Sequence, residues 1–368
     1  MFMRKYLIPV LIIVLSLAAC RRPDTSGRDT IALVKSIAAD YSAPEHILLA
    51  SNGKPASSGD IYIVGDSSSC ALISNSFLEC DIYENARGRY WSDGLKDFAG
   101  ERFASISDKI FTPYGSFGEQ NGYDALRELS VRFTLSALSP KCNASIYDLD
   151  GNLEKVPAKM IILADPWFQS YGKFDIDTLF TLCACSVPVI SPQDLLFDAA
   201  LGMEKKYFNC GIICDSLYLA SGIYQTVFNA KLTEHKVVGA HSFVAATPSG
   251  KVLAGFLESY LSAGGEEPLD ALLIDDWRVN LNSVEEEVKA MRDFSREEYL
   301  RYGKLLAPDF NVFAASQLTM SRCYELLRER SLFTHRIAQP QSLGFTVKAR
   351  PVEDGTEYLL IPVENVQD

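Results

Sequence analysis

Residues 208–242 read FNCGIICDSLYLASGIYQTVFNAKLTEHKVVGAHS and decide the fold of the chain. The apolar run that opens this stretch ends in Asp215, and the helical pattern of residues 217–232 follows it. A second apolar run then begins at Lys236. A strand, a crossover helix and another strand in this order are typical of a parallel sheet covered by helices. The stretch therefore predicts an α/β fold.

The same alternation extends in both directions. Upstream, the predicted strands are 61–64, 110–113, 144–149, 160–164 and 187–190, and the predicted helices are 126–138 and 176–183. Downstream, the predicted strands are 272–274 and 311–315, the predicted helices are 251–262, 284–306 and 320–328, and residues 344–363 form a strand pair. Two strand–helix series with a crossover near 192–215 predict two similar, Rossmann-like lobes with parallel sheets.

We predict five segments along the chain and a hinge between the lobes. The segments are a signal peptide (1–20), a tether (21–45), an N-terminal α/β lobe with an irregular first part (46–200), a C-terminal α/β lobe (201–335) and a hinge return with terminal strands (336–368). Hinge strands are expected near 192–210 and 330–345.

Composition excludes several classes of protein. The 368 residues are 48% apolar and 22% charged, which is enough apolar surface for one large core or two ordinary ones. The 35 basic and 47 acidic residues give a net charge of -12. Binding to phosphates needs a basic stripe, and none is visible in the sequence, so we expect no nucleic-acid partner.

The first twenty residues have the order of a secretory signal. Arg4 and Lys5 precede an apolar run, and small residues follow it up to Cys20. The sequence Leu17-Ala18-Ala19-Cys20 resembles the lipobox of bacterial lipoproteins. That resemblance implies lipidation at Cys20 and a membrane-anchored protein of the cell envelope, facing the periplasm or the surface.

Eight cysteines follow Cys20, and most of them lie in apolar stretches where a free thiol behaves as a small hydrophobe. In an exported chain we expect Cys70 and Cys80 to pair. The four histidines have no ligand spacing, so we expect no metal site. The sequence has no P-loop, and we expect no cofactor.

Polar and aromatic side chains follow the predicted strands. In open parallel sheets, ligands bind beyond the carboxyl ends of the strands. The predicted ligand-binding residues are Asn121, Tyr123, Asp165, Trp167, Ser191, Asp215, His241, Phe243, Asp275, Trp277 and Gln317. Purely structural roles stay open for all of them, because an aspartate after a strand is also a common helix N-cap and the aromatic residues could belong to the core.

The opening stretch is also similar to a known family. Tyr218-Leu219-Ala220-Ser221-Gly222 and Lys236-Val237-Val238-Gly239 resemble the crossover segment of the basic membrane protein family of substrate-binding lipoproteins, within the type I periplasmic binding protein superfamily. The resemblance covers about residues 108–330. It implies a non-enzyme that binds a small polar solute, nucleoside-like or sugar-like, in the cleft between the lobes. It also implies a membrane transporter permease as the partner, for ABC-type uptake or sensing.

Two alternatives come from other classes of protein. The run that ends in Gly65-Asp66-Ser67 resembles the first block of GDS-type esterases, which would make Ser67 a nucleophile. This chemistry needs a general base, which that family supplies from a late Asp-x-x-His motif. Here the last histidine, His335, is preceded by Leu332-Phe333-Thr334, so the motif is incomplete. The second alternative is a protein-interaction module on the same fold, whose cleft would be filled by its own side chains.

Overall fold

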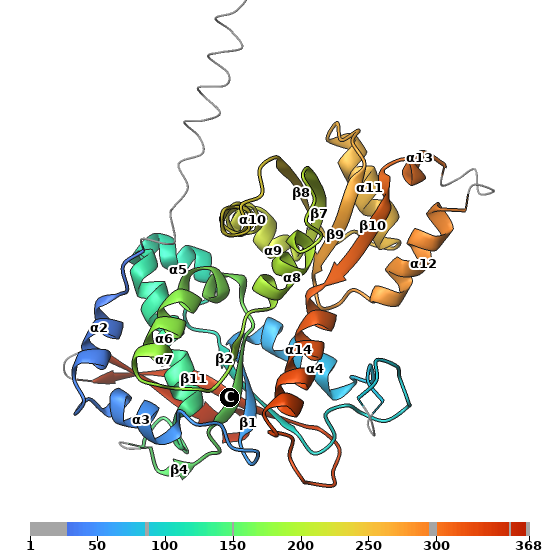
Figure 1. Cartoon of the computed structure of the whole chain (residues 1–368). Helices are drawn as coiled ribbons and strands as arrows, with labels where there is room; N and C mark the ends of the chain where they lie inside the picture. The colour runs from blue at the N-terminus through green and yellow to red at the C-terminus, as the bar shows by residue number, and fades with distance from the viewer. Residues whose placement is uncertain (1–27, 85–87, 149–150, 294–299, 353–354, 366–368) are drawn as a thin grey trace, which may run out of the picture.

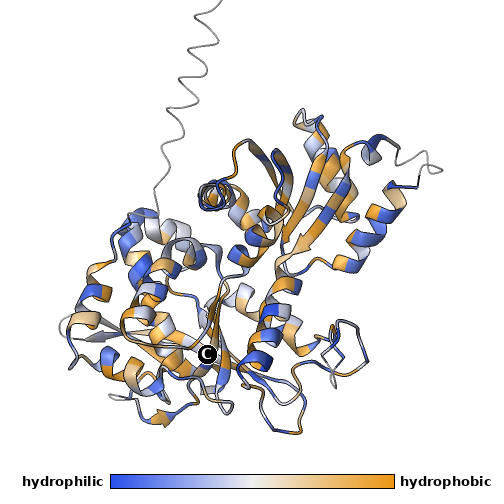
Figure 2. Cartoon of the chain, viewed as in Figure 1, coloured by the Kyte–Doolittle hydropathy of each residue, from blue (hydrophilic) through white to orange (hydrophobic). Residues whose placement is uncertain are grey.

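The computed structural model describes residues 28–84, 88–148, 151–293, 300–352 and 355–365. They form two α/β lobes, each built on its own sheet (Figure 1). The apolar residues concentrate on the strands and on the helix faces that cover them (Figure 2). The predicted α/β class with mainly parallel sheets is therefore confirmed.

The N-terminal lobe contains a six-stranded sheet in the order β12-β11-β2-β1-β5-β6. All neighbouring pairs are parallel except β11 and β12, which form an antiparallel hairpin. The strands are β1 (Asp60–Asp66), β2 (Arg102–Asp108), β5 (Ala158–Leu163), β6 (Val189–Ile190), β11 (Gln341–Val352) and β12 (Gly355–Pro362). Every residue of β1 and β5 is buried, which is expected where helices cover both faces of a parallel sheet.

Helices cover this sheet on both sides. The helix α4 (Ser67–Leu78) contacts β1 and β2, and it packs on α14 (Ala315–Glu329). The helix α6 (Tyr123–Leu138) contacts β1 and β5, and it packs on α3 (Pro44–Asn52) and α7 (Lys173–Leu182). Two further elements are α5 (Tyr114–Asn121) and the π-helix η2 (Phe168–Gly172). The small antiparallel pair β3 (Lys141–Cys142) and β4 (Leu153–Glu154) lies beside β12.

The C-terminal lobe contains four parallel strands in the order β10-β9-β7-β8. Its strands are β7 (Phe208–Cys214), β8 (Ala240–Ala246), β9 (Leu269–Asp275) and β10 (Leu306–Ala314). Its helices are α9 (Ser216–Leu219), α10 (Ile223–Glu234), α11 (Val252–Ser262), α12 (Leu281–Met291) and α13 (Leu300–Gly303). Read from the other edge, β8-β7-β9-β10 repeats the order β2-β1-β5-β6 of the first lobe, so the two lobes share one topology.

The chain passes between the lobes twice. The first passage runs through α8 (Pro192–Leu201) into β7, and the second runs from β10 into α14. Both helices contact elements of the two lobes. The predicted C-terminal lobe extends to residue 335, but α14 packs on α4 and α8 as well as on β9 and β10. A helix at such a junction has the same periodicity as one inside a lobe, so the sequence does not reveal its place.

Several predicted elements are displaced in the structure. Residues 110–113 are not a strand, because β2 ends at Asp108 before them. The described part of 144–149 is not a strand either. The predicted helix 284–306 ends at Met291. Part of the predicted tether is α2 (Ala32–Ala39), whose Val34 and Ile37 are buried in the core of the N-terminal lobe. The short apolar runs at 110–113 and 144–149 fit more than one kind of element, and only tertiary packing selects between them.

Three further observations concern predicted features of the chain. The eight cysteines after Cys20 are free, so the predicted pair of Cys70 and Cys80 is wrong: Cys70 is buried against β1 and β2, and the Cys80 thiol contacts Asp97. Within the described ranges, no three His, Cys, Asp or Glu side chains are grouped to hold a metal ion.

None of the helices described is both long and apolar enough to span a bilayer. Cys20 lies outside the described residues.

Lys155 is a buried lysine whose ammonium group lies on the faces of Tyr62 and Phe345. It donates to Tyr62 Oη at 3.2 Å and to the carbonyl oxygen of Ala137 at 3.3 Å. Burial lowers the pKa of Lys155 to about 7. Since the unfolded chain then binds more protons than the folded one between about pH 7 and 10.5, this group makes stability rise with pH across that window.

Lys155→Met is therefore expected to be more stable than the wild type at pH 7, and this difference in the free energy of unfolding should shrink as pH rises. At pH 7 the variant avoids burying a charge, and this benefit falls by about 1.4 kcal/mol for each pH unit towards pH 10. Urea unfolding at pH 7, 8 and 9 measures the difference. The exposed Lys141→Met serves as the control. A difference between variant and wild type that stays constant with pH would contradict the burial of a titrating amine.

Candidate functional site

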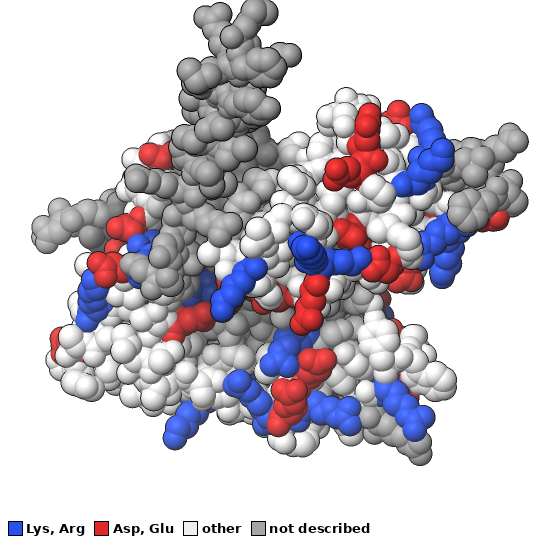
Figure 3. Space-filling view, turned by 45° about the horizontal axis from the view of Figure 1, so that its top comes forward, with Lys and Arg blue, Asp and Glu red and all other residues white. Residues whose placement is uncertain are grey.

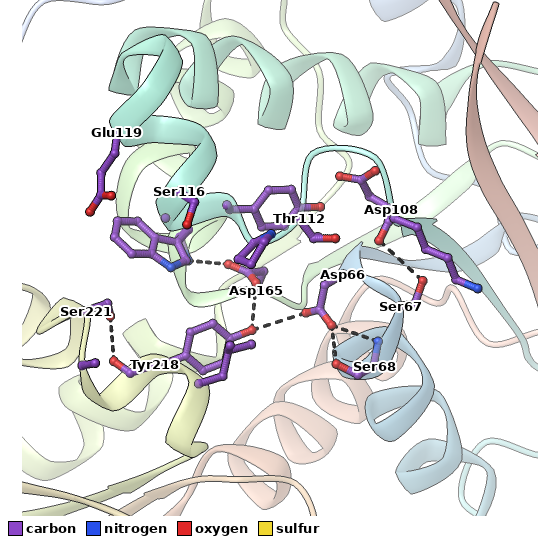
Figure 4. Close-up of a pocket in the computed structure, with 17 residues that line it drawn as sticks. Asp66, Ser67, Ser68, Asp108, Thr112, Ser116, Glu119, Asp165, Tyr218 and Ser221 are labelled. Atoms are coloured by element: carbon purple, nitrogen blue, oxygen red, sulfur yellow. Dashed lines mark hydrogen bonds between the residues drawn. The ribbon is translucent and has the colours of Figure 1, made fainter.

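A cavity of about 610 Å³ lies between the lobes, at the carboxyl ends of β1, β2 and β5. From the N-terminal lobe it is lined by the start of α4, the segment after β2 including the first turns of α5, and the residues that follow β5. From the C-terminal lobe it is lined by α9 and the residues after it. Figure 4 shows carboxyl groups of the N-terminal lobe and the hydroxyl group of Tyr218 from the C-terminal lobe meeting in this cavity.

Two aspartates at adjacent strand ends form its floor. Asp66 ends β1, and Asp165 follows β5, which pairs with β1 in parallel. Gly65 lets the end of β1 lie close to Ala164 after β5, because a Cβ on Gly65 would lie 3.1 Å from the Cβ of Ala164. Asp66 is the N-cap of α4, and its Oδ1 accepts the amide protons of Ser68 and Ser69. This structural role uses only one of the two carboxyl oxygens of Asp66.

The second oxygen of each aspartate faces Tyr218 of the other lobe. Asp165 Oδ1 accepts from the amide of Trp167 at 2.7 Å, which leaves Oδ2 to accept from Tyr218 Oη at 2.9 Å. Tyr218 Oη also lies 3.4 Å from Asp66 Oδ2 (Figure 4). A phenol has one proton, so it can donate to only one of the two carboxyl groups at a time. Both contacts are favourable when one carboxyl group is protonated.

The electrostatics of the site favour that protonated state. Asp165 is 2% exposed, and burial, together with the negative charge of Asp66, raises the pKa of Asp165 to about 8. Burial and the neighbouring carboxylates also raise the pKa of Tyr218. At neutral pH the floor of the cavity therefore holds a neutral carboxyl group and a neutral phenol, and the carboxyl group can release its proton near pH 8.

Tyr114 and Trp167 shape one wall of the cavity. Tyr114 begins α5, and its hydroxyl is buried beside the carboxyl group of Asp108. Burial raises the pKa of Asp108, and a hydrogen bond from the Tyr114 hydroxyl offsets part of that rise. A Cβ on Gly115 would lie 2.7 Å from the Trp167 ring, so glycine lets the indole lie directly against the start of α5. The wall of the cavity is consequently closely packed.

The C-terminal lobe repeats both strand-end sequences. Residues 63–67 (IVGDS) match 212–216 (IICDS), and residues 163–167 (LADPW) match 273–277 (LIDDW). In this second copy, Asp275 Oδ2 accepts from Tyr224 Oη at 2.9 Å, and burial raises the pKa of Asp275 to about 6. Arg278 pairs with Asp215 and Asp276 at 2.7 Å each. These groups do not line the 610 Å³ cavity.

The structure brings only two of the predicted ligand-binding residues to the cavity, Asp165 and Trp167. Tyr123 stacks on Trp167 and Tyr171 but does not line the cavity, and Asn121 is exposed at the end of α5. Ser191 is the N-cap of α8, which is a structural role.

The remaining predicted residues lie in or near the C-terminal lobe. Asp215 is the N-cap of α9, and His241 is exposed on β8. Phe243 packs on Phe256 and Tyr260 and also lines a second cavity of about 230 Å³. Trp277 packs towards Phe77, as a core aromatic would. Gln317 of α14 contacts Tyr90.

Sequence patterns do not reveal the other polar groups of the cavity. The motif at 218–222 contains Tyr218 without indicating its role, and nothing in the sequence distinguishes Asp108, Tyr114 and Glu119. The repeated strand-end sequences are the signal that points to Asp66, because they put an aspartate after the first and third strands of each lobe.

No family model matches the chain, and no curated protein is detectably similar to it in sequence. Among solved structures, it is similar to glutamate racemase RacE1 from Bacillus anthracis, with 14% identity over 79% of this chain and 89% of that one, and a TM-score of 0.47. Glutamate racemase from Francisella tularensis, solved with D-glutamate, has 14% identity, covers 80% and 90%, and gives 0.43. PH1733 from Pyrococcus horikoshii, an aspartate racemase homologue, has 11% identity, covers 73% and 99%, and gives 0.38.

These structures are racemases and not periplasmic binding proteins, so the resemblance to the basic membrane protein family is wrong. The functions inferred from it are corrected with it: the solute-binding lipoprotein, the transporter permease, the lipid-anchored membrane contact and the expectation of a non-enzyme. The physical reason is that alternating strands and helices occur in every open α/β fold, and short motifs such as that at 218–222 occupy similar turns in many of them.

The two alternative functions are not supported either. Ser67 Oγ lies 3.5 Å from the carbonyl oxygen of Asp108, and no histidine among the described residues lines the cavity to act as its base. The cleft is an open cavity and is not filled by the chain's own side chains, as an interaction module would require.

Proposed function

We propose that the chain is an enzyme that moves a proton at a carbon atom of a small, amino-acid-like substrate, a reaction of the racemase or epimerase type. Asp165 is its general acid–base group. The observation that carries the proposal is the buried carboxyl group of Asp165 at the floor of a cavity between two lobes, with a pKa of about 8.

A carboxyl group with this pKa suits acid–base catalysis near neutral pH. An efficient general base has a pKa near the operating pH, since it must be largely deprotonated and still accept a proton readily. Perturbation of this size needs both burial and a charged neighbour, and Asp66 supplies the second. A purely structural role as the acceptor for the Trp167 amide would use only Oδ1 of Asp165.

Proton transfer at this carbon takes two steps. The Asp165 carboxylate takes a proton from the carbon next to a carbonyl or carboxyl group, and the electron pair of the broken C–H bond moves onto that group. A proton then returns to the carbon from the enzyme or from water, which restores the substrate or gives its mirror image. Tyr218, which lines the cavity from the other lobe, holds Asp165 Oδ2 in place by a hydrogen bond.

Hydrogen exchange with solvent tests this proposal. Free amino acids of both hands are incubated with the protein in D₂O, and the loss of the α-proton signal is followed by ¹H NMR. Exchange in at least one of them is expected, with a rate that rises with pH through an apparent pKa near 8 because the carboxylate is the active form. No exchange in any of them, from a folded protein, would contradict the proposal.

Tyr218→Phe is expected to slow this exchange by about 10- to 100-fold, because it removes the hydrogen bond that positions Asp165. The pH at which the rate is half-maximal should rise as well, because the carboxylate loses a donor. Tyr207→Phe, an exposed tyrosine of the same lobe, is the control. Equal rates and equal pH profiles in the two variants would exclude a positioning role for Tyr218.

A further inference from the structure

We propose that Cys183 and Cys185 form a dithiol site that a small disulfide, such as oxidised glutathione, converts into an intrachain disulfide bond. The two cysteines follow α7 in the N-terminal lobe, and neither of them lines the 610 Å³ cavity. This site is therefore separate from the proposed proton transfer and goes beyond it.

Access to solvent separates these two thiols from the other cysteines that the structure describes. Cys183 and Cys185 are partly exposed, whereas the remaining six are buried. A small oxidant cannot reach a buried thiol in the folded protein, so the reaction should be confined to this pair. Surface charge offers no comparable distinction on the face drawn in Figure 3, where acidic side chains lie close to basic ones.

The end of α7 holds the two cysteines at a spacing that suits a disulfide bond. The amide of Cys185 donates to the carbonyl oxygen of Phe180 at 2.8 Å, and the amide of Ala184 donates to that of Thr181 at 3.3 Å. These are the two hydrogen bonds of a Schellman motif, and Ala184 has the left-handed conformation of that motif, with a φ of 53°. In a helical turn of either hand, α-carbons two residues apart are separated by about 5.4 Å. Disulfide bonds form at α-carbon distances of about 4.4–6.8 Å.

His46 marks Cys183 as the thiol that attacks first. Nδ1 of His46 lies 2.9 Å from the carbonyl oxygen of Ile37 and 3.7 Å from Sγ of Cys183. Since a carbonyl oxygen only accepts, Nδ1 carries a proton, and the same N–H group faces the sulfur atom. An N–H group in this position stabilises negative charge on the sulfur, and the thiolate is the nucleophile in disulfide exchange.

Cys185 is the second thiol of the pair. Burial raises the pKa of Cys185 to about 11; the Val187 amide, which donates to the sulfur, opposes this rise, and nearby Cys183 adds to it. Burial raises the pKa of Cys183 as well. A dithiol without a stabilised thiolate gains little from staying reduced, so its disulfide is the favoured state at equilibrium. The Cys185 thiolate is also a strong nucleophile once it forms.

The reaction takes two exchange steps. Cys183 loses its proton to water, and its sulfur attacks one sulfur of the small disulfide, which breaks the S–S bond and releases one small thiolate. Cys185 then loses its proton, and its sulfur attacks Sγ of Cys183, which releases the second small thiolate. The protein gives up two electrons and two protons, and the small disulfide is reduced to two thiols.

Alkylation after oxidation tests the proposal on the full chain. The reduced, folded protein is incubated with oxidised glutathione, then denatured in iodoacetamide and digested with trypsin. The peptide 174–205 contains only these two cysteines. We expect this peptide to become a disulfide that takes up no alkyl group, about 10-fold faster than any buried cysteine reacts. Two alkyl groups on this peptide under excess oxidised glutathione, or a disulfide that forms only in urea, would overturn the proposal.

Serine variants test the order of the two steps. Cys185→Ser should accumulate a glutathione adduct on Cys183, because no second thiol displaces it, and Cys183→Ser should gain an adduct about 10-fold more slowly. Cys80→Ser is the control, since a serine hydroxyl can keep the contact with Asp97, and it should form the disulfide at the wild-type rate. Equal adduct rates in the two variants would contradict the role of Cys183. Asp165→Asn should leave disulfide formation unchanged, which separates this result from that of the proposed function.

Discussion

Asp165→Asn is expected to lower the solvent-exchange rate by about 10³-fold and to make the folded protein more stable at pH 8. General acid–base groups typically contribute about 10²- to 10⁴-fold to a rate, and an amide cannot take up the substrate proton. The fold should tolerate the change, because the amide oxygen can still accept from the Trp167 amide and the amide nitrogen can donate to Asp66 or Tyr218. A variant that loses activity and gains stability identifies a residue whose role is catalytic and not structural.

The gain of stability follows from the pKa of Asp165. Because its pKa is about 8 in the folded protein and 3.8 ordinarily, the folded state binds more protons than the unfolded state between these values. The wild type therefore loses stability as pH rises through this window, by up to about 1.4 kcal/mol per pH unit. Asparagine has no proton to lose, so the advantage of the variant should grow from pH 5 to pH 8.

Exchange by NMR and urea unfolding at pH 5 and pH 8 measure both effects. Asp177→Asn is a suitable control, since Asp177 is a half-exposed aspartate that pairs with Lys173 on α7. A destabilised Asp165→Asn at pH 8, or exchange at the wild-type rate, would show that the carboxyl group is structural.

Lys159→Met is expected to destabilise the protein by about 3–5 kcal/mol. Lys159 and Glu101 form an ion pair of 2.5 Å in which both side chains are at most 1% exposed. The ammonium group also donates to the carbonyl oxygens of Ser57 and Leu332, and Glu101 Oε1 accepts the amide proton of Thr334. Removal of the lysine leaves a buried carboxylate without its counter-charge, and this loss exceeds what the pair itself contributes.

A double variant separates these two effects. Lys159→Met with Glu101→Leu should recover at least half of the loss, because no unpaired charge remains, although the three backbone groups lose their partners. Lys173→Met is the control, since Lys173 and Asp177 are also 2.5 Å apart but lie on the surface, where a pair contributes about 0–1 kcal/mol. Urea midpoints give all the values. A double variant no more stable than Lys159→Met would show that the unpaired charge is not the source of the loss.

Much of the sheet could be predicted from the sequence. The strand predicted from Phe208 to Cys214 has these limits in the structure, and the strand predicted at 160–164 is β5. Strands buried on both faces are uninterrupted apolar runs, which makes them recognisable. The loops are harder, because residues 110–113 and 144–149 are short apolar runs without a partner strand among the described residues. The terminal pair predicted at 344–363 is the β11–β12 hairpin.

The site is only half predictable, and the reason is its construction from two lobes. Asp165 and Trp167 follow a strand, and the rule on strand ends therefore finds them. Tyr218 lies in α9, one turn after β7, and it acts across the interface on the ends of β1 and β5. Contact across a lobe interface leaves no periodicity in the sequence. Tyr114 escapes prediction because it follows a loop and is buried, so it resembles a core residue.

Selective labelling of aspartate with ¹³C at the carboxyl carbon tests the central claim, that Asp165 holds a proton at neutral pH. The signal that is missing from Asp165→Asn identifies this residue, and its chemical shift is followed from pH 4 to pH 10. We expect this signal to titrate with an apparent pKa near 8. An Asp165 signal that titrates below pH 5 would contradict the claim, because a carboxyl group already ionised at that pH could not serve as the proposed acid–base group.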